Sequence, residues 1–357
     1  MQGRKEGTTI RKQTTIYDIA KEAGASPTTV SRVLSNSGYP VSERMRRRIL
    51  EAAERLHYVP NRVGRQLKQR RSMTIGVIVP TITNPFYSQL VLGIEETARE
   101  HGYHIMLCNT HQNMDFEAHY LQMLFELQVD GIVLSSITAK PELLKRYMER
   151  GMSIVNCDEW IEDLDLPQVG FDYERGGYLA TGYLLSLGHT EIAFMSAPLD
   201  RPSRKGMYNG YVRAMREAGL PLRSEWILVS DWKPSSTMGR VYEFENGRQL
   251  AEKYLQLKRK PSAVYCANDI TAIGVMQHLQ SYGVRIPDDL SIIGFDDIEF
   301  AQMVTPALSS VHHPKYNMGR IACLTLLHEL GVTEKKEENV GMDPTIVARA
   351  STITKKV

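Results

Sequence analysis

Residues 14 to 60 carry the pattern of three short amphipathic helices, and no other part of the chain constrains the fold as tightly. Thr15 stands three residues before Asp18, which is the spacing of a capping box, and apolar residues then recur at helical intervals. Ser26, followed by a proline, suits the N-cap of a second helix, and Ser42 precedes a third. Three short helices joined by a tight turn predict a helix-turn-helix.

The second of these helices has a surface suited to DNA. If it buries its valines, then Pro27, Thr28, Ser31 and Arg32 face outward. Small polar groups and one arginine can reach base edges in a major groove.

Charge is divided unevenly along the chain. Residues 1–72 contain 16 Lys and Arg against 6 Asp and Glu, whereas residues 73–357 contain 27 against 35. The formal net charge of +2 hides this difference. We therefore expect a basic module that binds a polyanion, attached to a body that does not bind one.

The cysteines show no metal-ligand spacing and lie far apart, at Cys108, Cys157, Cys266 and Cys323. We expect them to be reduced core residues, and we expect neither a metal site nor a cofactor. No apolar stretch reaches the roughly 20 residues that span a bilayer, and the polar start lacks the apolar region of a signal peptide. These features predict a cytoplasmic protein without a membrane partner. Residues 1–13, which are polar and contain glycine, are expected to be a disordered extension.

Residues 61–72 form a basic linker with helical potential. A helix of this length is marginal in water, and Gly64 should cost about 1 kcal/mol relative to alanine. On DNA, phosphate contacts could order the linker, and Leu67 is its one large apolar side chain available as a minor-groove wedge. An unstructured tether, with Leu67 packed on the body, fits the segment equally well.

From Thr74 onward, short strand-like runs alternate with amphipathic helical stretches. The first series of expected strands is 74–79, 103–107, 131–134 and 153–155, and the second is 192–195, 226–229, 263–266 and 290–294. This alternation predicts parallel sheets with helices on both faces, an α/β fold in two doubly wound lobes. Ligands of such sheets bind beyond the carboxyl ends of the strands, so the expected site is a cleft between the lobes.

Polar residues follow several of these strands. They are Asp158, Asn268, Asp269, Asp296 and Asp297, with Asn84 and Phe86 after the first strand. Carboxylates and amides can chelate neighbouring hydroxyls, and an aromatic face such as that of Trp232 can cover a sugar ring. Each residue has an alternative role, because Asp and Asn after a strand commonly cap the next helix.

The ordered motifs of the chain resemble the lactose-repressor/galactose-repressor (LacI/GalR) family of transcriptional regulators. Those motifs include residues 15–20, 28–34, 58–62, 84–87, 267–269 and 286–297, and the likeness runs from about Thr14 to Thr352. The resemblance implies a homodimer on a palindromic double-stranded operator, with the body built like a periplasmic sugar-binding protein. It also favours the wedge for Leu67, which aligns with the family's intercalating leucine.

The resemblance implies a role in DNA binding for thirteen residues. Base readers would be Pro27, Thr28 and Arg32, and Leu67 would be the wedge. Residues that mostly contact the backbone would be Thr15, Tyr17, Ser26, Thr29, Ser31, Asn36, Tyr58 and Asn61, with Arg62 in the linker.

The resemblance also implies a small-molecule effector, expected to be a sugar or sugar derivative. Its positions carry over to Asn84, Phe86, Asp158, Ser203, Trp232, Asn268 and Asp296. Two positions depart from the family's usual pattern, with Met207 where an arginine is common and His313 where a glutamine is frequent. Losing the arginine removes a fixed fork of donors, so a non-sugar effector or a protein partner stays an alternative.

The domain boundaries expected from the pattern and the resemblance are as follows. The helix-turn-helix takes residues 14–60, the hinge 61–72, and the effector-binding and dimerisation domain 73–357. The first lobe takes residues 73–171 and 298–328, and the second takes 172–297 and 329–357.

Two other classes of function are alternatives to a transcriptional regulator. An enzyme is disfavoured because the chain has no GxxxxGK[ST], GxGxxG, HExxH or GxSxG motif, and no catalytic residue is assigned. A DNA-architecture protein with a vestigial cleft would show low operator selectivity and no cleft ligand. The expected function is a repressor of carbohydrate-metabolism genes whose operator affinity depends on the effector.

The wedge hypothesis makes a direct prediction. Leu67→Ala should weaken affinity for the operator much more than affinity for random DNA, because only the kinked operator step is stabilised by the leucine. Titrations on both sequences measure this, and equal losses on the two would refute the wedge.

Overall fold

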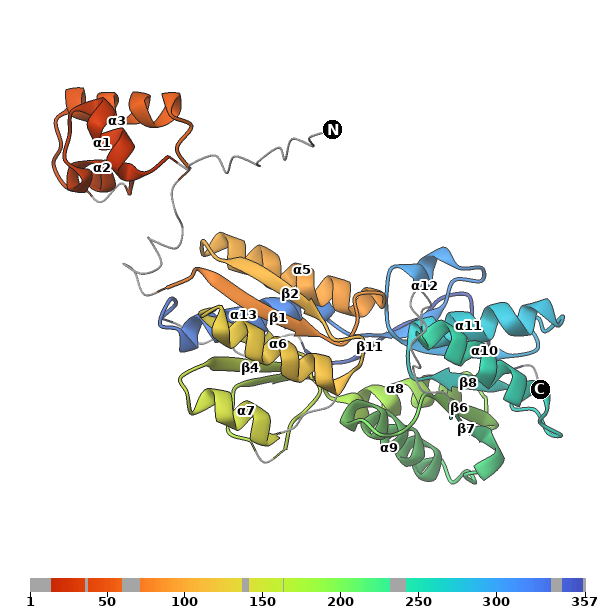
Figure 1. Ribbon diagram of the computed structural model, residues 1–357. Helices are drawn as coiled ribbons and strands as arrows, with labels where there is room; N and C mark the ends of the chain where they lie inside the picture. Colours follow the sequence, from red (N-terminus) through yellow and green to blue (C-terminus); the bar gives the residue numbers. More distant parts are fainter. Residues whose placement is uncertain are drawn as a thin grey trace, which may run out of the picture. The chain divides into compact units, whose positions relative to one another are not determined.

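The computed structural model describes residues 14–35, 38–59, 71–136, 141–162, 164–231, 242–334 and 342–355. Its contacts divide the chain into two compact units, Met1–Arg70 and Arg71–Val357 (Figure 1). Five predicted site residues fall outside the described residues: Asn36, Asn61, Arg62, Leu67 and Trp232. Within the described part, no helix has the length and apolar character needed to cross a bilayer.

The N-terminal unit contains the three predicted helices. They are α1 (Ile16–Ala23), α2 (Pro27–Leu34) and α3 (Glu43–Arg55). The Thr15 backbone N–H donates to the Asp18 carboxylate over 2.8 Å, and Ser26 Oγ accepts from the Thr29 N–H over 3.0 Å. Fully buried Ile19, Val30 and Ile49, one from each helix, form the centre of the small core. The structure therefore confirms the helix-turn-helix.

The first lobe of the body is a parallel sheet in the order β2-β1-β3-β4-β5. Its strands are β1 (Thr74–Val79), β2 (His104–Asn109), β3 (Gly131–Leu134), β4 (Ser153–Asp158) and β5 (Gln168–Gly170). Because β1 is buried on both faces, its side chains alternate between two cores. Ile75 and Val77 face α5 (Pro85–Glu100) and α13 (Lys315–Glu329). Ile78 faces α6 (Met114–Glu126) and α7 (Pro141–Met148).

The second lobe is a six-stranded sheet in the order β11-β10-β9-β8-β6-β7. Its strands are β6 (Ile192–Ser196), β7 (Ile227–Val229), β8 (Ala263–Cys266), β9 (Ser291–Asp296), β10 (Ser309–His312) and β11 (Thr345–Val347). All pairs are parallel except β10 with β11. One face is covered by α8 (Tyr173–Ser186) and α9 (Pro202–Glu217), and the other by α10 (Tyr242–Leu255) and α11 (Asp269–Ser281).

The short helices α12 (Phe300–Met303) and η1 (Ser224–Trp226) complete the second lobe. Trp226 therefore precedes strand β7, although the sequence predicted that it begins the strand. The two-lobed α/β architecture is confirmed, and the four cysteines lie buried and unpaired.

The predicted lobe boundary after Asp297 is wrong in part. Residues 298–312 belong to the second lobe, because β10 extends that sheet beside β9 and Ile298 packs in the core under α11. After β10 the chain returns to the first lobe with α13. Leu330, Val332 and Met342, which follow α13, also pack in the core of that lobe. The crossing therefore lies between β10 and α13.

Two glycines set the distance between α8 and α9. A Cβ placed on Gly177 would lie 2.2 Å from the Met207 carbonyl oxygen, and one on Gly210 would lie 2.1 Å from the Glu174 carbonyl oxygen. Such distances are far inside van der Waals contact, so the helix backbones touch only because side chains are absent there. This contact fixes α9, and with it Met207, against the second sheet.

Gly177→Ala should destabilise the body by on the order of 1–3 kcal/mol, because two backbones must separate. Gly182→Ala is the matched control in the same helix, since nothing lies within 4 Å of its added Cβ. That control should be neutral or stabilising by up to about 1 kcal/mol. Thermal unfolding measures both, and a Gly177 variant as stable as the Gly182 variant would contradict the close packing.

Candidate functional site

The predicted DNA-contacting residues of the described N-terminal unit lie on its surface. The exposed residues are Thr15, Tyr17, Ser26 and Thr28, and Tyr17 is 69% exposed to solvent. Half-buried positions are Pro27, Thr29, Ser31, Arg32 and Tyr58. Ser26 and Thr29 also serve structure, because they cap α2. The surface of α2 thus combines small polar groups with a single arginine.

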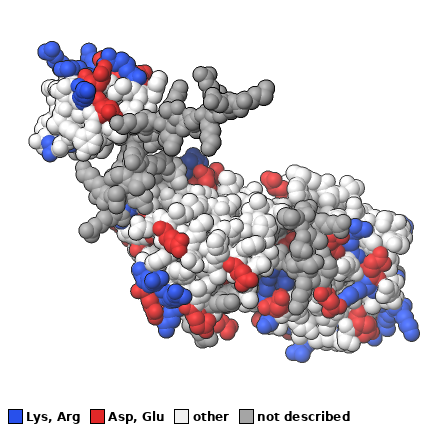
Figure 2. Space-filling model, in the orientation of Figure 1, with Lys and Arg blue, Asp and Glu red and all other residues white. Residues whose placement is uncertain are grey.

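Basic side chains gather at one edge of the N-terminal unit, among a few acidic ones (Figure 2). The Arg32 guanidinium lies 3.7 Å from the centre of the Tyr39 ring, a cation–π contact. Stacking on a ring orients the guanidinium and leaves its in-plane N–H donors available.

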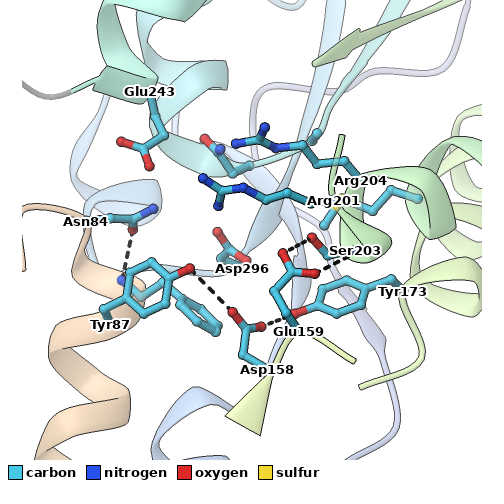
Figure 3. Close-up of a pocket in the computed structure, with 14 residues that line it drawn as sticks. Asn84, Tyr87, Asp158, Glu159, Tyr173, Arg201, Ser203, Arg204, Glu243 and Asp296 are labelled. Atoms are coloured by element: carbon cyan, nitrogen blue, oxygen red, sulfur yellow. Dashed lines mark hydrogen bonds between the residues drawn. The ribbon is translucent and has the colours of Figure 1, made fainter. Parts of the chain in front are cut away.

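In the body, a cavity lies between the two lobes. Residues from both lobes line it: Asn84, Phe86, Tyr87, Asp158, Glu159, Tyr173, Arg201, Ser203, Arg204, Met207, Glu243, Ala267, Asn268 and Asp296. Six of the seven predicted effector positions are therefore brought together, and the seventh, Trp232, is outside the described residues. Figure 3 shows their polar groups converging on a common space.

The two aspartates of the cavity occupy strained backbone positions at the ends of β4 and β9. Asp158 has a φ of 83° and Asp296 a φ of 106°, values that residues with a side chain rarely adopt. The strain turns each carboxylate from the strand end toward the cleft. Strained residues of this kind concentrate at functional sites.

Asn84 and Asn268 cap helices and line the cavity at the same time. Asn84 Oδ1 accepts from the Phe86 N–H over 3.0 Å, and Asn268 Oδ1 accepts from the Thr271 N–H over 2.7 Å. Capping uses the side-chain oxygen only. Each amide keeps two N–H donors for which the described residues provide no partner.

Three polar contacts join the lobes across the cavity. The Glu159 carboxylate accepts from Ser203 twice, from its N–H over 3.0 Å and from its Oγ–H over 2.5 Å. Ser203 stands in the first turn of α9, where backbone N–H groups lack partners within the helix. Tyr173 of the second lobe donates to Asp158, and Arg201 donates to Gln112 over 2.9 Å.

Burial controls the charge of the cavity. It raises the pKa of the Asp158 carboxyl to about 7, with a further rise from Glu159 and opposing effects from the Tyr173 and Tyr87 hydroxyls and from Arg201. Burial, and next the nearby Asp269, raise the pKa of Asp296 well above its usual range. Among the described residues, no group of three or more His, Cys, Asp or Glu is arranged to hold a metal ion.

His313 lies fully buried beneath the cavity, where it stacks on Phe171 with ring centres 4.0 Å apart. Its Nδ1 is 3.5 Å from Asp296 Oδ1, and neither ring nitrogen has a hydrogen-bond partner. Burial lowers its pKa well below the usual range, so the ring is neutral. Met207 lines the cavity as an apolar group in place of the expected arginine.

Sequence reasoning missed several of the lining residues. They are Tyr87, Glu159, Tyr173, Arg201 and Glu243. Arg204 also lines the cavity, but it donates to the Pro198 carbonyl and to Asp200. Its neighbour Lys205 is exposed. Glu243 had a detectable signal, because it begins a buried stripe with Asn246, Gly247 and Leu250 on α10.

Comparison with known proteins gives matches over both units. A family model described as "Bacterial regulatory proteins, lacI family" matches residues 15–61. A second, described as "Periplasmic binding proteins and sugar binding domain of LacI family", matches residues 72–347. The HTH-type transcriptional repressor PurR of Aliivibrio salmonicida is 35% identical over 338 residues, covering 94% of this chain and 98% of the relative.

Two further matches extend the comparison. Catabolite control protein A of Priestia megaterium is 38% identical over 309 residues, covering 86% of this chain and 90% of the relative. The solved lac repressor dimer bound to operator and the anti-inducer ONPF has a similar fold, with a TM-score of 0.82 and 24% identity. That likeness covers 96% of this chain and 100% of the other.

The raised pKa of Asp158 predicts how stability depends on pH. Between about pH 4 and 7 the folded carboxyl holds a proton that the unfolded chain has released, so its contribution to stability declines as the pH rises through this window. Asp158→Asn mimics the protonated form. It should melt a few degrees above the unmodified protein at pH 8, and the gap should close by about pH 5.5.

The exposed Asp165→Asn, on the segment between β4 and β5, is the matched control and should show no such pH-dependent gap. Melting curves of the ligand-free protein at pH 5.5 and 8 measure the effect. A constant difference between Asp158→Asn and the unmodified protein at both pH values would contradict the assigned shift.

Proposed function

The chain belongs to the LacI family of bacterial regulatory proteins, and from this premise we propose that it represses genes of carbohydrate metabolism under the control of a sugar bound between its lobes. That it is a DNA-binding transcriptional repressor follows from the family. The sugar, the palindromic operator and the homodimer are the proposal.

The observation that carries the proposal is the convergence of polar groups in the cavity. Asp158 and Asp296 supply acceptors for hydroxyl groups, and the amides of Asn84 and Asn268 supply donors. Phe86 provides an apolar ring against the same space. Donors and acceptors around an aromatic face suit a polyhydroxylated ring.

On the DNA side, we assign base reading to Pro27, Thr28 and Arg32 of α2. The exposure of Thr28 and the partial exposure of Pro27 and Arg32 support this assignment, as does the fixed position of α2 on its core. Thr15, Tyr17, Ser26, Thr29, Ser31 and Tyr58 would contact the DNA backbone. Asn36 and the linker residues Asn61, Arg62 and Leu67, which lie outside the described residues, would complete the interface. Phosphate contacts would supply most of the affinity and base contacts the selectivity.

Exposed apolar side chains support a homodimer. Four of them are between 39% and 64% exposed to solvent: Leu92 on α5, Tyr316 on α13, and Phe300 and Met303 on α12. A second copy of the chain would cover such groups. Dimerisation would also place two recognition helices on the two halves of a palindrome.

Control of DNA binding would pass through the contacts between the lobes. The Glu159–Ser203, Asp158–Tyr173 and Gln112–Arg201 contacts hold the lobes in the present arrangement. A ligand in the cavity touches both lobes and would change the balance among arrangements. The first lobe carries the linker to the helix-turn-helix, so this change would reach the DNA-binding unit.

A ligand panel tests the proposed function. An operator recovered from random DNA by selection is titrated with full-length protein, alone and with individual sugars, sugar phosphates and nucleobases. At least one sugar should shift operator affinity by about tenfold or more, within the usual range of coupling between sites. A sugar that binds the cavity tightly yet leaves operator affinity unchanged would contradict the coupling, and a response to nucleobases alone would contradict the sugar.

A further inference from the structure

The described lining of the cavity carries more negative than positive charge. Its carboxylates are those of Asp158, Glu159, Glu243 and Asp296, against the two guanidinium groups of Arg201 and Arg204. Charge of this kind in a buried site must be compensated by protons, by hydrogen bonds or by a bound group.

Half of these charged groups already have partners. Arg204 donates to the Pro198 carbonyl and to Asp200 over 3.0 and 3.1 Å, so it is held at the wall. Arg201 donates to Gln112, and Glu159 is held by Ser203 at the start of α9. The α9 helix terminus, which would otherwise favour an anionic ligand, is therefore occupied by a carboxylate of the chain itself.

The other three carboxylates form no ion pair with a lysine or arginine among the described residues. Asp158 accepts from the Tyr87 and Tyr173 hydroxyls, and the neutral His313 ring lies 3.5 Å from Asp296 Oδ1. The nearby Lys315 ammonium donates to the backbone carbonyl groups of Asp296 and Asp297, not to their carboxylates. Met207 stands on the same wall, where an arginine would have compensated the cavity carboxylates.

Glu243 gives the most direct indication of a missing partner. Its side chain is 6% exposed, and its buried Oε2 has no hydrogen-bond partner among the described residues. In Figure 3 its carboxylate points from the first turn of α10 into the space that Asp296 also faces. An ammonium group has three N–H donors and one positive charge, which two such carboxylates can share.

We propose that the ligand of this cavity is a sugar that carries a protonated amine, with Glu243 and Asp296 accepting the ammonium group. Asp158, Asn84 and Asn268 then bind the hydroxyl groups. This inference rests on the proposed function, since it takes the cavity to bind a sugar. A metal ion is not the cation, because the acidic groups among the described residues do not form a metal cluster.

The experiment compares the binding of sugars that differ in charge. Calorimetric titration of the full-length protein at pH 7.5 uses three sets of probes: glucosamine, galactosamine and mannosamine; their neutral parents glucose, galactose and mannose; and their uncharged N-acetyl derivatives. At least one amine should bind on the order of tenfold or more tightly than its neutral parent and its N-acetyl derivative.

Two variants identify the group that recognises the amine. Glu243→Gln keeps the size of the side chain and should reduce the preference for the amine over its neutral parent to about twofold or less. Glu245→Gln on the same helix is the matched control, because Glu245 pairs with Arg248 outside the cavity, and it should leave the preference unchanged. Circular dichroism and melting curves establish that both variants fold.

The pH supplies a readout that packing alone would not produce. As the pH falls from 7 to 5.5, a range in which the aminosugar is already mostly protonated, protonation of the cavity carboxyls should weaken amine binding, whereas binding of a neutral sugar should change little.

The outcomes separate this inference from the proposed function. Neutral parents that bind as tightly as the amines, or a Glu243→Gln variant that keeps the preference, would overturn the inference and leave a sugar-controlled repressor in place. Failure of every amine to bind at millimolar concentration would overturn it too. Failure of the broader sugar panel to shift operator affinity would instead overturn the proposed function.

Discussion

Burial of carboxylates between two lobes is the constraint on which the rest of the site depends. A charge in a low-dielectric interior needs hydrogen bonds, a counter-charge or a proton. Here the compensation comes from across the cleft, since Ser203 of the second lobe binds Glu159 of the first and Tyr173 binds Asp158. The groups that keep the cavity polar are therefore the groups that join the lobes. A molecule that changes the charge of the cavity must also change the contacts between the lobes.

Strand topology explains why these groups meet. Apart from β11, the strands of each sheet run parallel, so their carboxyl ends face the same edge of the sheet, and β4 and β9 place Asp158 and Asp296 there. The positive φ values at both aspartates turn their side chains toward the cleft. The chain then crosses back through α13, which packs on the first sheet after β10 has joined the second. Each lobe thus depends on chain segments that the other lobe interrupts.

The sequence predicted the repeating features of this structure and missed those that depend on distant contacts. Runs such as Thr74–Val79 and the capping pattern of Thr15 are local, and they gave the strands and helices closely. The place of residues 298–312 was wrong because which sheet β10 joins depends on its pairing with β9, and no local pattern encodes that pairing. Polar residues at strand ends such as Asp158 could be predicted to line the cavity. Arg201 and Glu243 were missed because charged residues are exposed in most helices and loops, although the buried stripe that Glu243 begins on α10 was a local signal against that expectation.

The same geometry limits how a ligand can act. A ligand shifts the balance between arrangements only by the difference in its affinity for them. Contacts to Asn84 and Asp158 belong to the first lobe, and contacts to Asn268 and Glu243 belong to the second, so a ligand that uses both sets binds fully only when the lobes stand as they do here. The Glu159–Ser203 pair favours this arrangement without any ligand. The ligand-free balance therefore depends on that pair and on the cost of burying the other carboxyl groups, which protons offset when no ligand is bound.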